Sequence, residues 1–116
     1  MIKDKTKKFF NGKAAKIMGA KYKLLTDDTL LNEHDLLGLS IHYRPSKIVI
    51  DSTLQSSDFV STFLHEVLEV INRRSETKIE HDKITQLENG LYNFIANNPK
   101  LMYTLLEEIY SKEHKR

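Results

Sequence analysis

Residues 56–74 read SSDFVSTFLHEVLEVINRR, and this stretch decides the fold. Its apolar residues recur at helical spacing, and the two arginines at its end suit the negative pole of a helix dipole. The stretch therefore predicts an amphipathic helix from about Ser56 to Arg74. Such a helix needs other elements to bury its apolar side, and the flanking sequence supplies them.

Strands are predicted before this helix and further helices after it. Residues 38–43 and 46–51 alternate apolar and polar side chains at period two around Arg44-Pro45, which indicates a hairpin. Residues 17–25 predict a first strand with a turn or bulge at Gly19. Helical patterns follow over residues 79–97 and again from Leu101. The predicted fold class is α+β, with a small three-stranded antiparallel sheet packed on two or three helices.

Composition and charge limit the class of protein. The 116 residues predict a single core and include no cysteine, so a metal site must use His, Asp or Glu. No apolar run is long enough for a membrane span or a secretory signal, so we expect a cytoplasmic protein without membrane contact.

Positive charge is concentrated near the start of the chain. Residues 1–23 contain eight lysines and one aspartate, whereas the remainder has more acids than bases. We therefore divide the chain into a basic N-terminal arm, residues 1–15, and a single domain with a C-terminal helix, residues 16–116. Such an arm is ordinarily a solvated terminus, and Phe9 and Phe10 are candidates for pinning a short helix to the body. Alternatively, the arm binds nucleic acid or an acidic protein.

The predicted central helix carries a possible metal site. His65 and Glu69 are four residues apart and therefore lie on one helix face, and Glu66 lies beside them. Two ligands at this spacing, with a carboxylate next to the first as general base, are typical of zinc hydrolases. The same residues also fit the solvated side of an amphipathic helix, together with their polar neighbours Asp58, Ser61, Thr62, Asn72 and Arg73.

An ordered series of motifs resembles a known family. The segments are residues 17–22 (IMGAKY), 37–39 (LGL), 47–51 (KIVID), 63–66 (FLHE) and 87–92 (LENGLY), with Asn97-Asn98 at the end. Over residues 16–98 the chain resembles small phage and prophage zinc metallopeptidase-like proteins, related to the ImmA/IrrE and SprT-like gluzincins. The resemblance implies a minimal zincin-like domain and a protein from a phage or its host's cytoplasm.

The resemblance also implies a ligand set with one exchange. Many relatives have His-Glu-x-x-His and a third, acidic ligand that opens the following helix. Here Glu69 occupies the position of the second histidine and His81 lies near that of the acid, so two imidazoles and one carboxylate are retained. We expect His65, Glu69 and His81 to bind one zinc ion and Glu66 to act as the catalytic general base. The resemblance further implies that a peptide substrate lies along an edge strand formed by residues 47–51.

Several roles remain open in the sequence. Glu88 is expected either to orient a ligand imidazole or to be a fourth ligand. His42 and Tyr92 are candidates for hydrogen-bonding an oxyanion, although half-buried structural residues are the more ordinary interpretation. Three functions are compatible with the sequence: a zinc peptidase acting on a protein or peptide, a zinc-stabilised protein-binding module without catalysis, and a metal-free interaction protein that uses its basic arm. The sequence does not indicate an oligomeric state.

Overall fold

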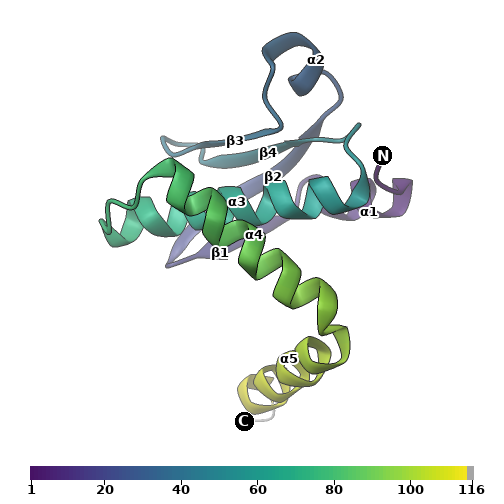
Figure 1. Cartoon of the computed structure of the whole chain (residues 1–116), viewed down its shortest axis with the longest axis vertical. Helices are drawn as coiled ribbons and strands as arrows, with labels where there is room; N and C mark the ends of the chain where they lie inside the picture. Colours follow the sequence, from purple (N-terminus) through teal and green to yellow (C-terminus); the bar gives the residue numbers. More distant parts are fainter. Residues whose placement is uncertain (115–116) are drawn as a thin grey trace.

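Four strands form a mixed sheet in the computed structural model, which describes residues 1–114. The last two residues of the predicted 16–116 domain lie outside the described residues. The strands are β1 (Ala14–Ile17), β2 (Ala20–Asp27), β3 (Gly38–Ile41) and β4 (Lys47–Asp51), in the order β1-β2-β4-β3 (Figure 1). Neighbouring strands are antiparallel except β2 and β4, which are parallel.

The α+β class is confirmed, but the prediction of three antiparallel strands is wrong. Residues 17–25 were expected to form one strand with a turn or bulge at Gly19; the turn is present, but it joins two strands, β1 and β2, in a hairpin across Met18 and Gly19. Both turn residues have positive φ, 49° and 83°, which is the backbone twist that a two-residue hairpin turn requires. Strands β3 and β4 form the predicted hairpin around Arg44-Pro45, and β4 also pairs in parallel with β2.

Within residues 1–114 five helices accompany the sheet, where two or three were predicted. They are α1 (Asp4–Phe10), α2 (Leu30–His34), α3 (Ser56–Ser75), α4 (His81–Asn97) and α5 (Pro99–His114). Helix α3 crosses one face of the sheet, α4 packs against α3, and α5 extends away from the sheet (Figure 1). None of the helices in residues 1–114 combines the length and apolar character that crossing a bilayer requires.

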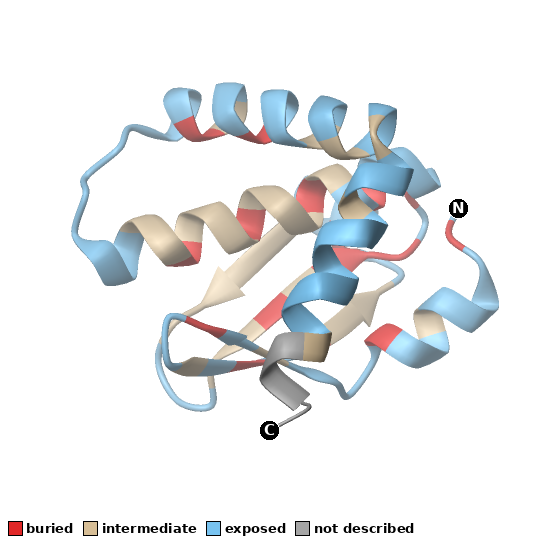
Figure 2. Cartoon of the chain, turned by 90° about the horizontal axis from the view of Figure 1, so that it is seen from below, coloured by how far each residue is buried: buried red, intermediate tan, exposed pale blue. Residues whose placement is uncertain are grey.

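The core lies between the sheet and α3 (Figure 2). Period-two alternation directs Tyr22 and Leu24 of β2 and Ile48 and Ile50 of β4 toward the helix, and all four are buried. Phe59 and Val70 of α3 close the core from above. This packing holds α3, which carries the predicted site, in a fixed position over the sheet.

The N-terminal arm contributes to the core. Phe10 is buried and makes edge-to-face contacts with Phe59 and Phe63 at centroid distances of 5.2 and 5.3 Å. Ile2 is also buried, whereas Phe9 remains exposed beneath the ammonium group of Lys13. Of the two phenylalanines, Phe10 therefore pins α1 to the body.

Strand β4 does not lie at an edge of the sheet. The expectation that residues 47–51 form the edge along which a peptide lies is wrong, because β2 and β3 flank β4 on both sides. Within residues 1–114, β3 is the edge strand on this side. The strand that offers unpaired backbone groups next to the predicted site is therefore β3 and not β4.

Strand β3 approaches α3 closely at Gly38. A Cβ atom at this position would lie 2.8 Å from Cγ2 of Thr62 and 2.9 Å from Cδ1 of Ile50. Those distances are shorter than van der Waals contact, so any larger residue would push the strand away from the helix. Glycine at position 38 therefore sets the spacing between β3 and the helix that carries His65 and Glu66.

Candidate metal centre

The structure brings together the three predicted metal ligands. His65 and Glu69 lie one turn apart on α3, and His81 is the first residue of α4. One donor atom from each residue lies within 4.8 Å of the others. Oε2 of Glu69 is 3.1 Å from Nδ1 of His81 and 3.7 Å from Nε2 of His65. Among the side chains that the structure describes, this is the one group arranged to hold a single cation.

Asn72 fixes the connection that delivers His81 to α3. Its side-chain amide donates to the carbonyl of Ile79 and accepts from the amide of Ile79, both at 2.9 Å. It also accepts a hydrogen bond from the hydroxyl of Thr77. These contacts satisfy both backbone groups of Ile79 and fix the connection two residues before α4 begins. Sequence reasoning missed this role, although an asparagine in the last turn of a helix is a recognisable signal.

Glu88 orients the imidazole of His65. Its Oε1 is 3.2 Å from Nδ1 of His65, and its Oε2 accepts a hydrogen bond from the hydroxyl of Ser61. With both carboxylate oxygens engaged, Glu88 is an orienting partner in this structure and not a fourth member of the cation group. The contact places the ring proton on Nδ1 and leaves the Nε2 lone pair for a metal ion.

Glu66 is buried beside this group. The interpretation that Thr62 and Glu66 belong to a solvated helix side is wrong, because α3 is covered by the sheet and the two residues are only 9% and 8% exposed. Burial raises the pKa of the Glu66 carboxyl above its ordinary value, while a hydrogen bond from Ser40 of β3 acts in the opposite direction. A raised pKa suits a general base that takes up a proton near neutral pH.

A cavity of about 300 Å³ is lined by Glu66 and by two of the three predicted ligands, His65 and His81, but not by Glu69. Its walls come from the start of β3 and from α3 and α4: Leu37, Gly38, Thr62, His65, Glu66, His81, Thr85 and Glu88. The side chain of His81 is 73% exposed, so this ring forms the open rim of the site. A ligand entering the cavity thus meets the buried carboxylate of Glu66 and the cation group together.

Two imidazole nitrogens and one carboxylate oxygen form the donor set. Zinc accepts these atoms, and three protein ligands of this kind are found in catalytic zinc sites. Nε2 of His65 and Nδ1 of His81 face the same carboxylate oxygen of Glu69, at 3.7 and 3.1 Å. Hence the residues present fit a zinc ion.

His42 and Tyr92 do not line this cavity, in contrast to their expected role at an oxyanion. Nδ1 of His42 accepts a hydrogen bond from the buried hydroxyl of Tyr22 at 2.8 Å, and its Nε2 lies 3.5 Å from the hydroxyl of Ser40. Burial lowers the pKa of His42, and the charge of Arg73 lowers it further. The neutral ring therefore connects Tyr22 to Ser40, which in turn donates to Glu66.

We expect His42 to make folding stability depend on pH. Because the pKa of the folded ring is lowered from its ordinary 6.5, the unfolded chain binds the proton first as the pH falls. The His42 contribution is complete above the unfolded pKa and decreases as the pH falls toward the folded pKa. Replacing His42 by Gln should flatten urea-unfolding stability between pH 7.5 and about 5. A variant with the slope of the parent would contradict this assignment.

Comparisons with family models, with curated proteins and with solved structures find no match to this chain.

Proposed function

We propose that the chain is a zinc-dependent peptide hydrolase in which His65, Glu69 and His81 hold the metal ion. One observation carries the proposal: His65 and His81 line a single cavity with the buried Glu66, and the Glu69 carboxylate lies within 3.1 and 3.7 Å of their ring nitrogens. The two elements that form the site are α3 and the start of α4, as in the metallopeptidase-like phage proteins that the sequence resembles. A phage or prophage origin belongs to the same proposal.

The residues around the cavity have distinct tasks in this reaction. Zinc, when bound, polarises a substrate carbonyl and lowers the pKa of a coordinated water to about 7. Glu66 takes the proton from the attacking water and later delivers it to the leaving amine. Glu88 keeps Nδ1 of His65 protonated, and Ser40 holds the Glu66 carboxylate toward the cavity.

The free edge of β3 supports a peptide as the substrate. Leu37 and Gly38, at the beginning of this edge, line the cavity that contains Glu66. An extended peptide that adds to the edge through backbone hydrogen bonds would therefore pass the cation group. Such binding depends little on substrate side chains, and the cavity itself accommodates one small or medium-sized side chain.

Elemental analysis tests the metal assignment directly. Protein purified without added metal and dialysed against trace zinc should contain about one zinc per chain, as expected for a three-ligand site. His81→Ala should lose this zinc, since the rim ligand is removed. The matched control is His34→Ala, which alters an exposed histidine on α2 and should retain the metal. A parent chain without zinc, or a His81→Ala variant that keeps it, would contradict the proposal.

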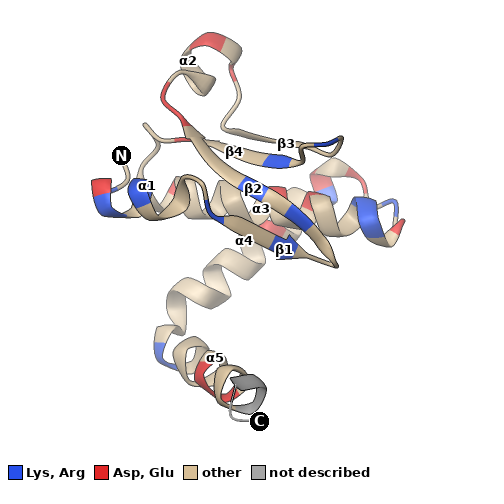
Figure 3. Cartoon of the chain, turned by 180° about the vertical axis from the view of Figure 1, so that it is seen from behind, with Lys and Arg blue, Asp and Glu red and all other residues tan. Residues whose placement is uncertain are grey.

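A second candidate function, binding of duplex DNA, is favoured by the outer face of the sheet. Strand register places Lys16 directly opposite Lys21, and Lys23 directly opposite Lys47 (Figure 3). Like charges at such positions repel each other and destabilise the sheet. None of these four lysines forms an ion pair with a described acid. Phosphate groups would relieve the repulsion, and the face would replace the predicted arm as the contact surface.

Salt dependence separates this function from hydrolysis. The affinity for a fluorescein-labelled DNA duplex should fall with salt concentration, and Lys21→Gln/Lys23→Gln should reduce the log–log slope by about 2. The control Lys83→Gln/Lys100→Gln removes the same charge from α4 and α5 and should preserve the slope. Absence of binding at low salt, or equal effects of the two pairs, would exclude DNA binding by this face.

A further inference from the structure

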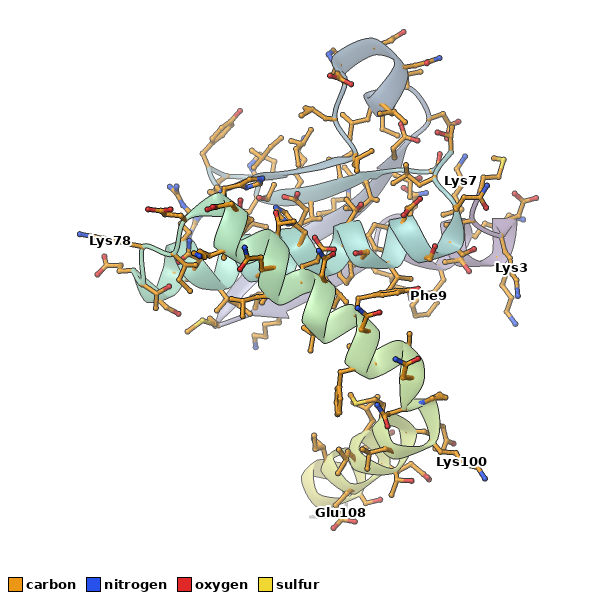
Figure 4. The ribbon with its side chains drawn as sticks, viewed as in Figure 1. Lys3, Lys7, Phe9, Lys78, Lys100 and Glu108 are labelled. Carbon is orange, nitrogen blue, oxygen red and sulfur yellow. The ribbon has the colours of Figure 1, made fainter. Side chains whose placement is uncertain are left out.

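Helix α5 exposes an apolar side that the other residues described by the structure do not cover. Leu101, Leu105, Leu106 and Ile109 are 46–60% exposed, and Tyr103 is 67% exposed. Met102 is half-buried. The polar residues of α5 occupy the other side, where Lys100 and Glu108 project outward (Figure 4). Sixteen residues in a helix with so little packing are only marginally stable in water.

The C-terminal half of α4 continues the exposed apolar surface. Ile84 and Glu88 are buried, whereas Leu87, Leu91 and Phe94 are 52%, 38% and 46% exposed. In Figure 1 this part of α4 leads away from the sheet to α5. Two successive helices thus carry large apolar side chains that face solvent in the single chain.

The exposed apolar area is sufficient for a stable dimer. The eight side chains Leu87, Leu91, Phe94, Leu101, Tyr103, Leu105, Leu106 and Ile109 are on average about half exposed. At roughly 200 Å² for a large apolar or aromatic side chain, they expose on the order of 800 Å² together. A standard protein interface buries about 800 Å² on each partner, whereas the largest apolar patch of a typical monomer covers about 300–600 Å².

The shape of α5 also suits a helix as the occupant. Tyr103, Leu106 and Ile109 line a groove of about 600 Å³ along this helix, together with Glu107, Tyr110 and Ser111. Apolar ridges of a second helix fit such grooves. Over residues 101–106 the helix carries no charged residue. This apolar stretch is suited to packing on its own two-fold copy.

We propose that two copies of this chain form a symmetric dimer through α4 and α5, with α5 of each copy packed against α5 of the other. The dimer covers the eight apolar side chains and stabilises α5 by tertiary packing. The dimer uses neither the cavity at His65, Glu66 and His81 nor the free edge of β3. Dimer formation is therefore independent of metal binding.

Sedimentation equilibrium of the full chain tests the proposal. The expected mass is twice the 13.5 kDa of one chain at micromolar concentration. Leu105→Glu should weaken the dimer by at least about 30-fold, because a charge then enters the centre of the interface. The matched control is Thr104→Glu, which adds the same carboxylate on the polar side and should leave the dissociation constant unchanged. A monomeric parent at 100-fold higher concentration would overturn the proposal, and so would equal effects of the two variants.

Disulfide trapping locates the interface independently of folding effects. The chain has no cysteine, so Leu105→Cys introduces a single thiol at the centre of the interface, where a residue lies close to its own two-fold copy. Mild oxidation should convert this variant to a covalent dimer, whereas Thr104→Cys should remain uncross-linked. A dimer that the Leu105→Cys thiol does not trap would show that the copies meet elsewhere and would overturn the assignment to α5.

Discussion

Replacing Glu66 by glutamine will leave the zinc content unchanged and reduce hydrolysis of fluorescein-labelled casein by about 10²–10⁴-fold, the contribution of a positioned general base. Glu66 is buried in the cavity wall, and its pKa is raised by that burial. Glutamine preserves the shape and the hydrogen bond to Ser40 but cannot accept the proton of water. Activity and metal content measured on the same preparation separate catalysis from metal binding.

A matched control for this experiment is Glu76→Gln. Glu76 is an exposed residue that ends α3, remote from the cavity lining. It should retain parental hydrolysis and zinc. A Glu66→Gln variant as active as the parent would remove the peptidase proposal. A parent that binds zinc without hydrolysing any peptide would leave a zinc-stabilised binding module as the function.

Addition of zinc to metal-free protein will raise the melting temperature by about 10 °C when free zinc is 100-fold above its dissociation constant. Binding to the folded state alone contributes about 2.7 kcal/mol under that condition, and each kcal/mol shifts the midpoint of a domain of this size by roughly 4 °C. The physical reason is that zinc joins α3 to the start of α4, two segments otherwise connected by the turn that Asn72 holds.

Substitutions at the site should reduce the zinc-induced rise in melting temperature to different extents. His65→Ala removes a ligand and should abolish the shift. Glu88→Gln weakens the orientation of the His65 ring and should lower the zinc affinity by about 10- to 100-fold, as is typical for partners of ligating histidines. His34→Ala should retain the full shift. If His65→Ala is stabilised by zinc as strongly as the parent, the ion binds elsewhere on the chain.

Local patterns were sufficient for much of the fold. The helix over residues 56–74 and the helix over residues 79–97 agree with α3 and α4, and the hairpin around Arg44-Pro45 agrees with β3 and β4. These elements have strong periodicity and short connections, so neighbouring residues determine them. The sequence placed a turn or bulge at Gly19 but left the two alternatives open, because a glycine inside an apolar run indicates either one; only the structure shows that the turn separates two strands.

The sequence patterns did not predict the contacts between segments that are distant in the chain. The parallel pairing of β2 with β4 joins residues more than twenty positions apart, and it moves the free sheet edge from residues 47–51 to β3. Similarly, a polar residue such as Glu66 can lie on a solvated or a covered side of a helix. Only the packing of α3 between the sheet and α4 decided that it is buried.

By itself the sequence determined the residue types of the candidate site and their helical spacing, because His65, Glu66 and Glu69 belong to one continuous helix. The tertiary structure decided that His81 lies next to His65 and Glu69, and that the Glu88 carboxylate contacts Nδ1 of His65. It also decided that the apolar side of α5 is exposed. The physical reason is the range of the interactions involved. Hydrogen bonds within a helix follow from adjacent residues, whereas burial and the approach of side chains depend on how all elements pack together.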